Sequence, residues 1–250
     1  MNSINILNIQ IDNLSHRELW VILNNFLHGS TGSLITTVNP EFILSARKNN
    51  AFRTILNNAD LSLPDGFGLS LAALTYGRKL IRHTGADLTA ELLAYAEKNN
   101  LPLAIINWRG GLSSAATLQS ALLAKFPRLN LIIEDISRTK NLGQRQAERL
   151  AKFKPIILLS SLGSPWQEYF LDSHRSTWPS VRLMMGVGGS FDFITKRIKR
   201  APKLWRASGL EWLWRLIQQP CRWRRIWRAV VVFSWQFLIW RFSNKKPANT

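Results

Sequence analysis

The run LAII at residues 103–106, followed by LNLII at 129–133 and IILLS at 156–160, decides the fold of this chain. Each run is short and apolar, as expected of a strand that is buried on both faces of a sheet. Helical patterns at 113–125 and 143–153 separate the three runs. Short apolar strands that alternate with helices predict an α/β fold, with a mostly parallel, Rossmann-like sheet and helices on both faces.

The alternation continues on both sides of this stretch. Further strands are predicted at 34–38, 61–63 and 182–187, and further helices at 40–49, 88–97 and 165–174. In folds of this kind, ligands bind outside the carboxyl ends of the strands, where loops lead into helices. Functional residues are therefore expected in the loops that follow the strands.

Length and composition allow one large domain with an appendage. The chain has 250 residues, and 46% of them are hydrophobic, which suffices for a sizeable core. The first stretch, MNSINILNIQIDNLSHREL, has neither a basic start nor an unbroken apolar run, so no signal peptide is expected. The single cysteine, Cys221, excludes an internal disulfide and suits a reducing cytoplasm.

Positive charge is concentrated towards the end of the chain, whose formal net charge is +18. Residues 195–250 hold fourteen Lys or Arg against one acidic residue, Glu211, a net charge of +13, and seven of the eleven tryptophans. We therefore predict two units, an α/β domain at 1–194 and a basic, Trp-rich helical appendage at 195–250. Such a charge implies an anionic partner, either a phospholipid surface or nucleic acid.

Within the appendage, the uncharged run 229–240 favours a membrane surface. It has twelve residues, whereas a helix needs roughly 20 to cross a bilayer, so it suits the lipid interface. Alternating Trp and Arg would also suit single-stranded nucleic acid, and part of 204–217 could instead pack on the domain. The residues expected to bind the membrane are Arg222, Trp223, Arg224, Arg225, Trp227, Arg228, Trp235 and Trp240.

Polar residues follow two of the predicted strands. Thr37 and Asn39 stand at the end of the first strand and would face a ligand cleft, although Asn39 could simply cap the helix that Pro40 opens. Asp65 lies in a Pro-Asp-Gly turn after the next strand. A carboxylate held there could act as a general base, or the turn could be an ordinary one.

Two further loops carry candidate ligand-binding groups. Arg82 could clamp a diphosphate, with main-chain N–H groups near Gly85 adding to it, and Asp87 could cap the helix that follows. Gln167 could donate a hydrogen bond to an anionic ligand. Alternatively, Ser164 and Gln167 could form a capping box at a helix start.

Gly188 and Gly189 follow the last predicted strand, where glycine lets the backbone approach a ligand closely. Their spacing does not match the G-x-G-x-x-G dinucleotide loop. The four histidines and the cysteine show no metal-ligand spacing, and the chain has neither a Gly-x-Ser-x-Gly elbow nor a Walker loop. We expect no metal site and no cofactor.

Taken together, the motifs resemble those of the WecG/TagA/CpsF glycosyltransferase family, in order and over about three-quarters of the chain. The strings that carry the resemblance are VNPE (38–41), ADLSLPDGFG (59–68), RHTGADL (82–88), LGSPWQE (162–168), GVGGSFDF (186–193), KRAP (199–202) and GLEWLWRLIQQP (209–220).

This resemblance implies an inverting transfer of a sugar from a UDP-sugar. The sugar would be N-acetylmannosamine or its uronic acid, and the acceptor an N-acetylglucosamine on undecaprenyl diphosphate in envelope polysaccharide synthesis. It also implies that Asp65 is the general base and that Thr37, Asn39, Arg82 and Gln167 bind substrate. The enzyme would then work at the cytoplasmic face of the bacterial inner membrane as a peripheral protein, with no nucleic acid partner and with an oligomer possible.

The chain departs from the family pattern after the strand at 103–106. Relatives often carry Gly-Gly-Lys-Pro-Gly there, whereas this chain has Asn-Trp-Arg-Gly-Gly at 107–111, so that Arg109 and the last glycine persist. Residues 134–137 and His83 also differ from the usual family residues. Three alternatives stay open: a glucosyltransferase acting on a lipid-linked exopolysaccharide intermediate, a basic nucleic-acid-binding module, and an inactive scaffold.

Overall fold

A computed structural model describes residues 2–243, so the outermost ends of the two predicted units, residue 1 and residues 244–250, lie outside the described residues. Within residues 2–243, six parallel strands form the central sheet, in the order β4-β3-β8-β7-β5-β6. The strands are β3 (Ser33–Val38), β4 (Leu61–Pro64), β5 (Leu103–Trp108), β6 (Leu131–Ile136), β7 (Ile157–Ser160) and β8 (Leu183–Gly186). The predicted parallel α/β sheet is confirmed.

Helices cover both faces of the sheet, as the sequence predicts. On one face α1 (His16–His28), α5 (Gly85–Lys98) and α6 (Ala115–Lys125) pack against alternate strand residues such as Ile35 and Ile105. On the other face α3 (Asn50–Asn58), α7 (Gln144–Phe153) and α8 (Trp166–Ser173) pack against their neighbours Leu34 and Ile106. Successive strand residues point to opposite faces, so a continuous apolar strand supplies both cores.

An N-terminal hairpin was not predicted. β1 (Ser3–Ile6) and β2 (Ile9–Asp12) pair antiparallel through a two-residue turn at Leu7 and Asn8, which both have positive φ. Such a turn is usually signalled by Asn-Gly or Asp-Gly, and this one lacks the glycine. The hairpin buries its isoleucines against α2 (Pro40–Lys48) and α4 (Phe67–Leu74) in a third apolar cluster.

Helix starts agree with the sequence in one case and differ in two. The Asn39 side chain caps α2, accepting from the N–H groups of Glu41 (3.0 Å) and Phe42 (3.2 Å). The prediction that Asp87 caps α5 is wrong, because Thr84 is the cap and accepts from the Asp87 N–H at 3.1 Å. The alternative that Ser164 and Gln167 form a capping box is also wrong, because α8 begins only at Trp166 and has no side-chain cap.

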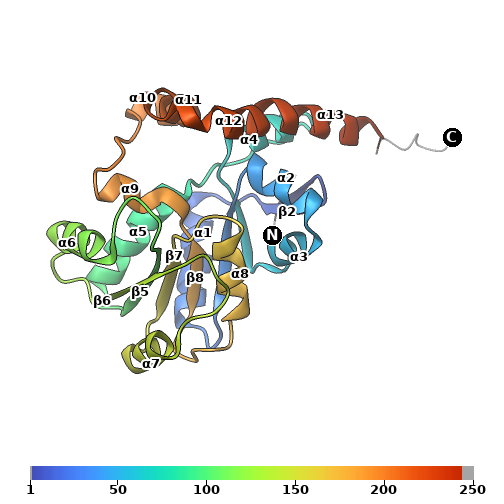
Figure 1. Cartoon of the computed structure of the whole chain (residues 1–250). Helices are drawn as coiled ribbons and strands as arrows, with labels where there is room; N and C mark the ends of the chain where they lie inside the picture. The colour runs from blue at the N-terminus through green and yellow to red at the C-terminus, as the bar shows by residue number, and fades with distance from the viewer. Residues whose placement is uncertain (1, 244–250) are drawn as a thin grey trace.

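The C-terminal segment forms a helical layer along the carboxyl ends of the strands (Figure 1, orange to red). After η1 (Gly188–Ser190) and α9 (Phe191–Ile194), it contains α10 (Lys203–Ala207), α11 (Glu211–Gln218), η2 (Pro220–Arg222), α12 (Trp223–Trp227), the π-helical turn η3 (Arg228–Val232) and α13 (Phe233–Ser243). Across residues 2–243, the structure contains no helix with the length and apolar character that a membrane span requires.

Part of the run 229–240, which the sequence pattern assigned to the membrane surface, packs on the α/β domain. Phe233 and Phe237 are 1% and 3% exposed and lie in the third cluster with Phe42 of α2 and Leu69 of α4. Packing on the domain, which the sequence suggested only for part of 204–217, therefore extends into the run 229–240 that was assigned to the membrane. Phe233 and Phe237, one helical turn apart, are core residues of α13, whereas Trp235, Leu238 and Ile239 are exposed.

Candidate active site

A cleft of about 900 Å³ lies where the carboxyl ends of the strands meet the C-terminal helices. Its floor comes from the segments that follow β3, β4, β5, β7 and β8, which the parallel sheet brings to one edge. Its roof comes from α11, α12 and η3. Thr37, Asn39, Asp65, Arg82, Gly85, Gln167, Gly188 and Gly189, eight of the ten residues predicted for the site, line this one cleft.

Asp65 lies at the bottom of the cleft, directly after β4. Its N–H donates to the Val38 carbonyl at 2.8 Å, and its Oδ2 accepts from the Gly85 N–H at 3.2 Å. The pKa of Asp65 is raised to about 6, chiefly by burial and also by nearby Glu211, while the Gly85 hydrogen bond, Arg82 and Arg215 limit the rise. Protein atoms surround the carboxylate, yet part of its surface stays open to the cleft, as a general base requires.

Thr37 and Gly85 flank this carboxylate. A Cβ atom at Gly85 would lie 3.0 Å from Thr37 Oγ1 and 3.6 Å from Asp65 Oδ2, so the three groups converge at the start of α5. Glycine at this position lets the α5 N-terminus approach the carboxylate. The neighbouring turn is equally tight, because a Cβ at Gly66 would lie 2.3 Å from Pro40 Cδ.

Arginines supply positive charge to the cleft from both the domain and the appendage. Arg82 also donates to the Arg206 carbonyl, and Arg225 forms a two-pronged pair with Glu41 at 2.9 and 2.6 Å. Burial lowers the pKa of Arg215, and burial with neighbouring Arg215 and Arg225 lowers the pKa of Arg222 to about 10. Like charges held together in a cleft favour an anionic ligand.

Three of these cleft positions were assigned to the membrane by the sequence pattern. Arg222, Arg225 and Arg228 line the same cleft as Asp65. A basic, Trp-rich sequence does not reveal which face of its helices packs on a domain. Only the tertiary contacts therefore distinguish the residues that line the cleft from those that could contact a membrane. Trp223, Trp227 and Trp235 of the same segment are exposed.

Gln167 fixes the glycine loop that forms another side of the cleft. Its Oε1 accepts from the Gly188 N–H at 3.0 Å, and its Nε2 donates to Glu168 Oε1 at 2.6 Å. A Cβ at Gly186 would lie only 2.3 Å from Gln167 Nε2. Glu168, which the sequence analysis missed, is buried below the loop, and burial raises its pKa to about 7.

Two predicted site residues lie outside the cleft lining. Asp87 pairs with Arg200 at 2.8 Å and Arg206 at 3.3 Å, and thereby ties α5 to the C-terminal segment. Arg109 is exposed and donates to the Asp135 carbonyl at 3.1 Å. The residue beside it, Trp108, does line the cleft, with the Arg138 guanidinium 3.6 Å from its ring.

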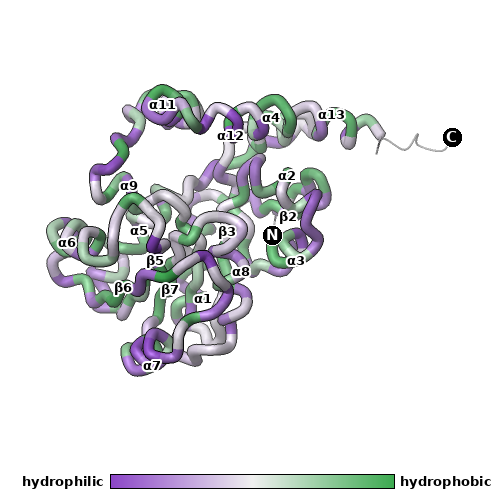
Figure 2. Tube along the Cα trace, viewed as in Figure 1, coloured by the Kyte–Doolittle hydropathy of each residue, from purple (hydrophilic) through white to green (hydrophobic). Residues whose placement is uncertain are grey.

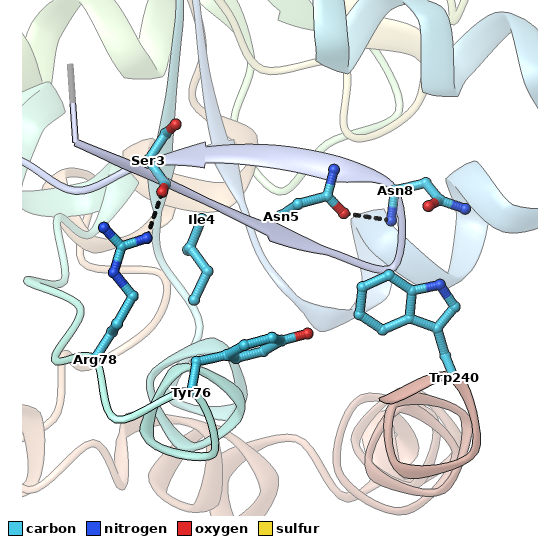
Figure 3. Close-up of a pocket in the computed structure, with 7 residues that line it drawn as sticks. All are labelled: Ser3, Ile4, Asn5, Asn8, Tyr76, Arg78 and Trp240. Carbon is cyan, nitrogen blue, oxygen red and sulfur yellow. Dashed lines mark hydrogen bonds between the residues drawn. The ribbon is translucent and has the colours of Figure 1, made fainter. Parts of the chain in front are cut away.

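A second hollow, of about 510 Å³, lies between the N-terminal hairpin, the end of α4 and α13. Figure 3 shows Trp240, which was expected at the membrane, beside the hairpin and across from Tyr76. Arg78 closes one end by donating to the Ser3 carbonyl at 2.7 Å. Trp240 therefore packs partly on the domain and is not fully on the outer face.

Comparisons with known proteins identify a family and a similar protein. The model described as "Glycosyl transferase WecG/TagA/CpsF family" matches residues 4–247. A similar protein is the N-acetylglucosaminyldiphosphoundecaprenol N-acetyl-beta-D-mannosaminyltransferase of Bacillus spizizenii (strain ATCC 23059 / NRRL B-14472 / W23). It is 31% identical over 215 residues, which cover 85% of this chain and 80% of the relative.

Proposed function

The chain belongs to the WecG/TagA/CpsF family of glycosyltransferases, and from that premise we propose that it transfers an N-acetylmannosamine-type sugar from a UDP-sugar to a lipid-linked acceptor. The acceptor is an N-acetylglucosamine on undecaprenyl diphosphate, as in the name of the Bacillus relative. One observation carries the proposal: a carboxylate with a pKa of about 6 lies in the same cleft as several arginines. A base and an anion site are the two things this transfer needs.

Asp65 acts as the base in a single displacement. The acceptor hydroxyl gives its proton to Asp65 as its oxygen bonds to the anomeric carbon of the donor. The bond from that carbon to the UDP oxygen breaks, and the electron pair leaves with UDP. Attack from the face opposite the leaving group inverts the anomeric centre.

The arginines stabilise the diphosphate that leaves. Arg82, Arg215 and Arg222 all line the cleft, and at the pH of the reaction each carries its charge. Fixed guanidinium groups donate to phosphate oxygens bidentately and need no reorganisation as charge develops. They supply the counter-charge that a divalent cation provides in other enzymes, so transfer continues without added metal.

The remaining predicted residues hold the donor. Asn39 Oδ1 is occupied in capping α2, which fixes the side chain at the cleft, and the amide nitrogen then donates to a sugar or phosphate oxygen of the donor. Thr37 stands beside Asp65, and the loop of Gly188 and Gly189, which Gln167 holds, brings main-chain groups close to the ligand.

The appendage at 195–250 also docks the enzyme on the cytoplasmic face of the inner membrane. Trp223, Trp227 and Trp235 are exposed. An indole suits the headgroup boundary because its N–H remains hydrogen-bonded to water while its ring is buried in the apolar region. Basic residues of the segment, such as exposed Arg224, attract anionic headgroups. Arg222, Arg225 and Arg228 serve the cleft instead.

A donor screen tests the proposal. The purified protein is given a panel of UDP-sugars together with N-acetylglucosaminyl diphosphoundecaprenol, and UDP release is measured. UDP-N-acetylmannosamine should give the fastest release, and the Asp65→Asn protein should give almost none. Preference for UDP-glucose would favour the exopolysaccharide alternative, and acceptor-dependent release with no donor on the panel would refute the proposal.

A further inference from the structure

The helix α4 is apolar on every side. Its sequence, FGLSLAAL, contains a single polar residue, Ser70. Leu69, Ala72 and Ala73 are buried in the third apolar cluster. The other face carries Phe67, Leu71 and Leu74, which are 37%, 50% and 59% exposed. A helix at a water-facing surface normally has polar residues on its outer face, so the exposed face of α4 needs a partner.

Part of that exposed face borders the active-site cleft. Phe67 and Leu71 line the cleft, whereas Leu74 does not. Ile226 of α12 and Val230 of η3 line it from the C-terminal segment. We call these four residues, Phe67, Leu71, Ile226 and Val230, the apolar rim.

The two sides of the apolar rim, α4 and the C-terminal segment, pack on each other. A Cβ at Gly68 of α4 would lie 3.6 Å from the Phe233 ring of α13, and a Cβ at Gly209 would lie 2.3 Å from the Phe67 ring. Figure 2 shows apolar stretches of α4 and α13 along the same edge of the molecule. The cleft therefore opens between apolar side chains that the fold holds in place.

The chemistry of the cleft changes from its floor to this rim. Asp65 and Arg82 line the floor and Arg215 lines the roof above them, whereas the apolar rim carries no charge and is partly exposed. A nucleotide or a free sugar would gain little from such a rim. A ligand with an anionic diphosphate head and a hydrocarbon tail matches both parts.

We propose that the apolar rim binds the first isoprene units of the polyprenyl-diphosphate acceptor. This inference rests on the proposed function and adds to it a subsite in this chain. The rim takes the tail at the point where it leaves the diphosphate. Leu74, on the same face of α4 but outside the cleft, touches lipid but not the bound tail.

Equilibrium binding tests the subsite without a membrane and without sugar transfer. N-acetylglucosaminyl diphosphates that carry a dimethylallyl, geranyl or farnesyl tail are titrated into the full chain in the presence of UDP, and heat is measured. In the wild-type protein the farnesyl compound should bind at least about tenfold more tightly than the dimethylallyl compound, because added isoprene units bury apolar surface.

Substitutions separate the rim from general apolar exposure. Leu71→Gln and Val230→Gln should abolish most of the dependence on tail length, because they should weaken binding of the farnesyl compound far more than binding of the dimethylallyl compound. Leu74→Gln and Val21→Gln, at equally exposed apolar positions outside the cleft, should retain the dependence. Both target side chains are already about half exposed, so glutamine leaves the core intact.

The outcomes distinguish this inference from the proposed function. Equal affinity for all three tails, or equal effects of Leu71→Gln and Leu74→Gln, would overturn the rim as a subsite while sugar transfer stands. Tail-dependent binding that Leu71→Gln removes would support the rim even if the donor screen detects no transfer. No affinity for any of the three compounds would overturn it as well.

Discussion

Asp65 is held so that it can both lose and accept a proton near neutral pH. Burial raises its pKa to about 6, and the hydrogen bond from the Gly85 N–H, together with Arg82 and Arg215, limits the rise. An isolated surface aspartate would be a weaker base by about two pKa units. The environment of a single side chain thus adjusts its basicity to the acceptor hydroxyl.

Replacing Asp65 with asparagine should remove the base and keep the fold. We expect Asp65→Asn to lower kcat by about 10²–10⁴-fold, as typical of a lost general base, with UDP affinity nearly unchanged. Steady-state kinetics and UDP titration measure the two effects. Asp172→Asn, on α8 outside the cleft, is the control, and near-normal kcat in Asp65→Asn would rule out this role.

The pH profile of the wild-type enzyme should follow the same group. The base works only when ionised, so kcat/KM should rise as the pH increases through about 6 and then level off. Measurement of kcat/KM across this range checks the expectation. A rate that is already maximal well below pH 6 would show that another group limits the reaction.

Glu168 should make stability depend on pH. Burial raises its pKa to about 7, so the folded protein holds this proton more tightly than the unfolded chain does. Its contribution is complete below the ordinary carboxyl pKa and is lost as the pH rises through about 7. We therefore expect the free energy of unfolding, measured with urea, to fall less between about pH 5 and about pH 8 in Glu168→Gln than in the wild type.

Glutamine suits this test because its side-chain oxygen can still accept from Gln167. The exposed Glu148→Gln on α7 is the matched control and should behave as the wild type. Parallel pH curves for the wild type and Glu168→Gln would mean that Glu168 stays ionised throughout and that burial does not hold its proton.

At the scale of elements, the strands of the central sheet were predictable because each is a continuous apolar run between helical patterns. The exception is β6, predicted at 129–133 and found at Leu131–Ile136. It is one of the two edge strands, and its last residues include Glu134, which pairs with Arg149 at 3.0 Å, and Asp135, so charged residues concealed its end. Local pattern alone does not distinguish an edge strand from a loop.

Most of the site was predictable for a related reason. Residues after parallel strands gather at one edge, so Thr37, Asp65 and Gln167 meet although they are distant in sequence. The arginines of the appendage were not assigned to the cleft, because only the docking of α13 decides which face of the segment turns inwards. Glu168 was missed because a buried acid in a helix has no local signal.

The docking of α13 should depend on its inward phenylalanines. Phe237→Ala should destabilise the protein by about 3–5 kcal/mol, the usual cost of a large cavity, because Phe237 is 3% exposed within the third cluster. Its neighbour Leu238 is 43% exposed, and Leu238→Ala should cost much less. Chemical denaturation compares the two, and equal effects would place α13 off the domain.

At the scale of the whole molecule, the outward tryptophans should attach the enzyme to lipid. We expect the double substitution Trp227→Gln and Trp235→Gln to reduce co-sedimentation with anionic liposomes severely. High salt should weaken binding of the wild type only in part, because salt screens the charges but not the apolar contribution. Deleting 222–250 is a poorer test, since it also removes Arg222, Arg225 and the buried phenylalanines.

Val21→Gln, an exposed apolar position on α1, is the control for the liposome experiment. It should sediment as the wild type does. If the tryptophan double variant sediments as fully as the control, the membrane contact lies elsewhere on the molecule.

The central claim is that one base and one bound diphosphate carry out a direct displacement, and the configuration of the product tests it most directly. The disaccharide made from a UDP-sugar of defined anomeric configuration is isolated, and the coupling at its new anomeric carbon is read by nuclear magnetic resonance. Direct displacement with Asp65 as the base predicts an inverted anomeric centre. Retention of the donor configuration would require two displacements and would contradict the account.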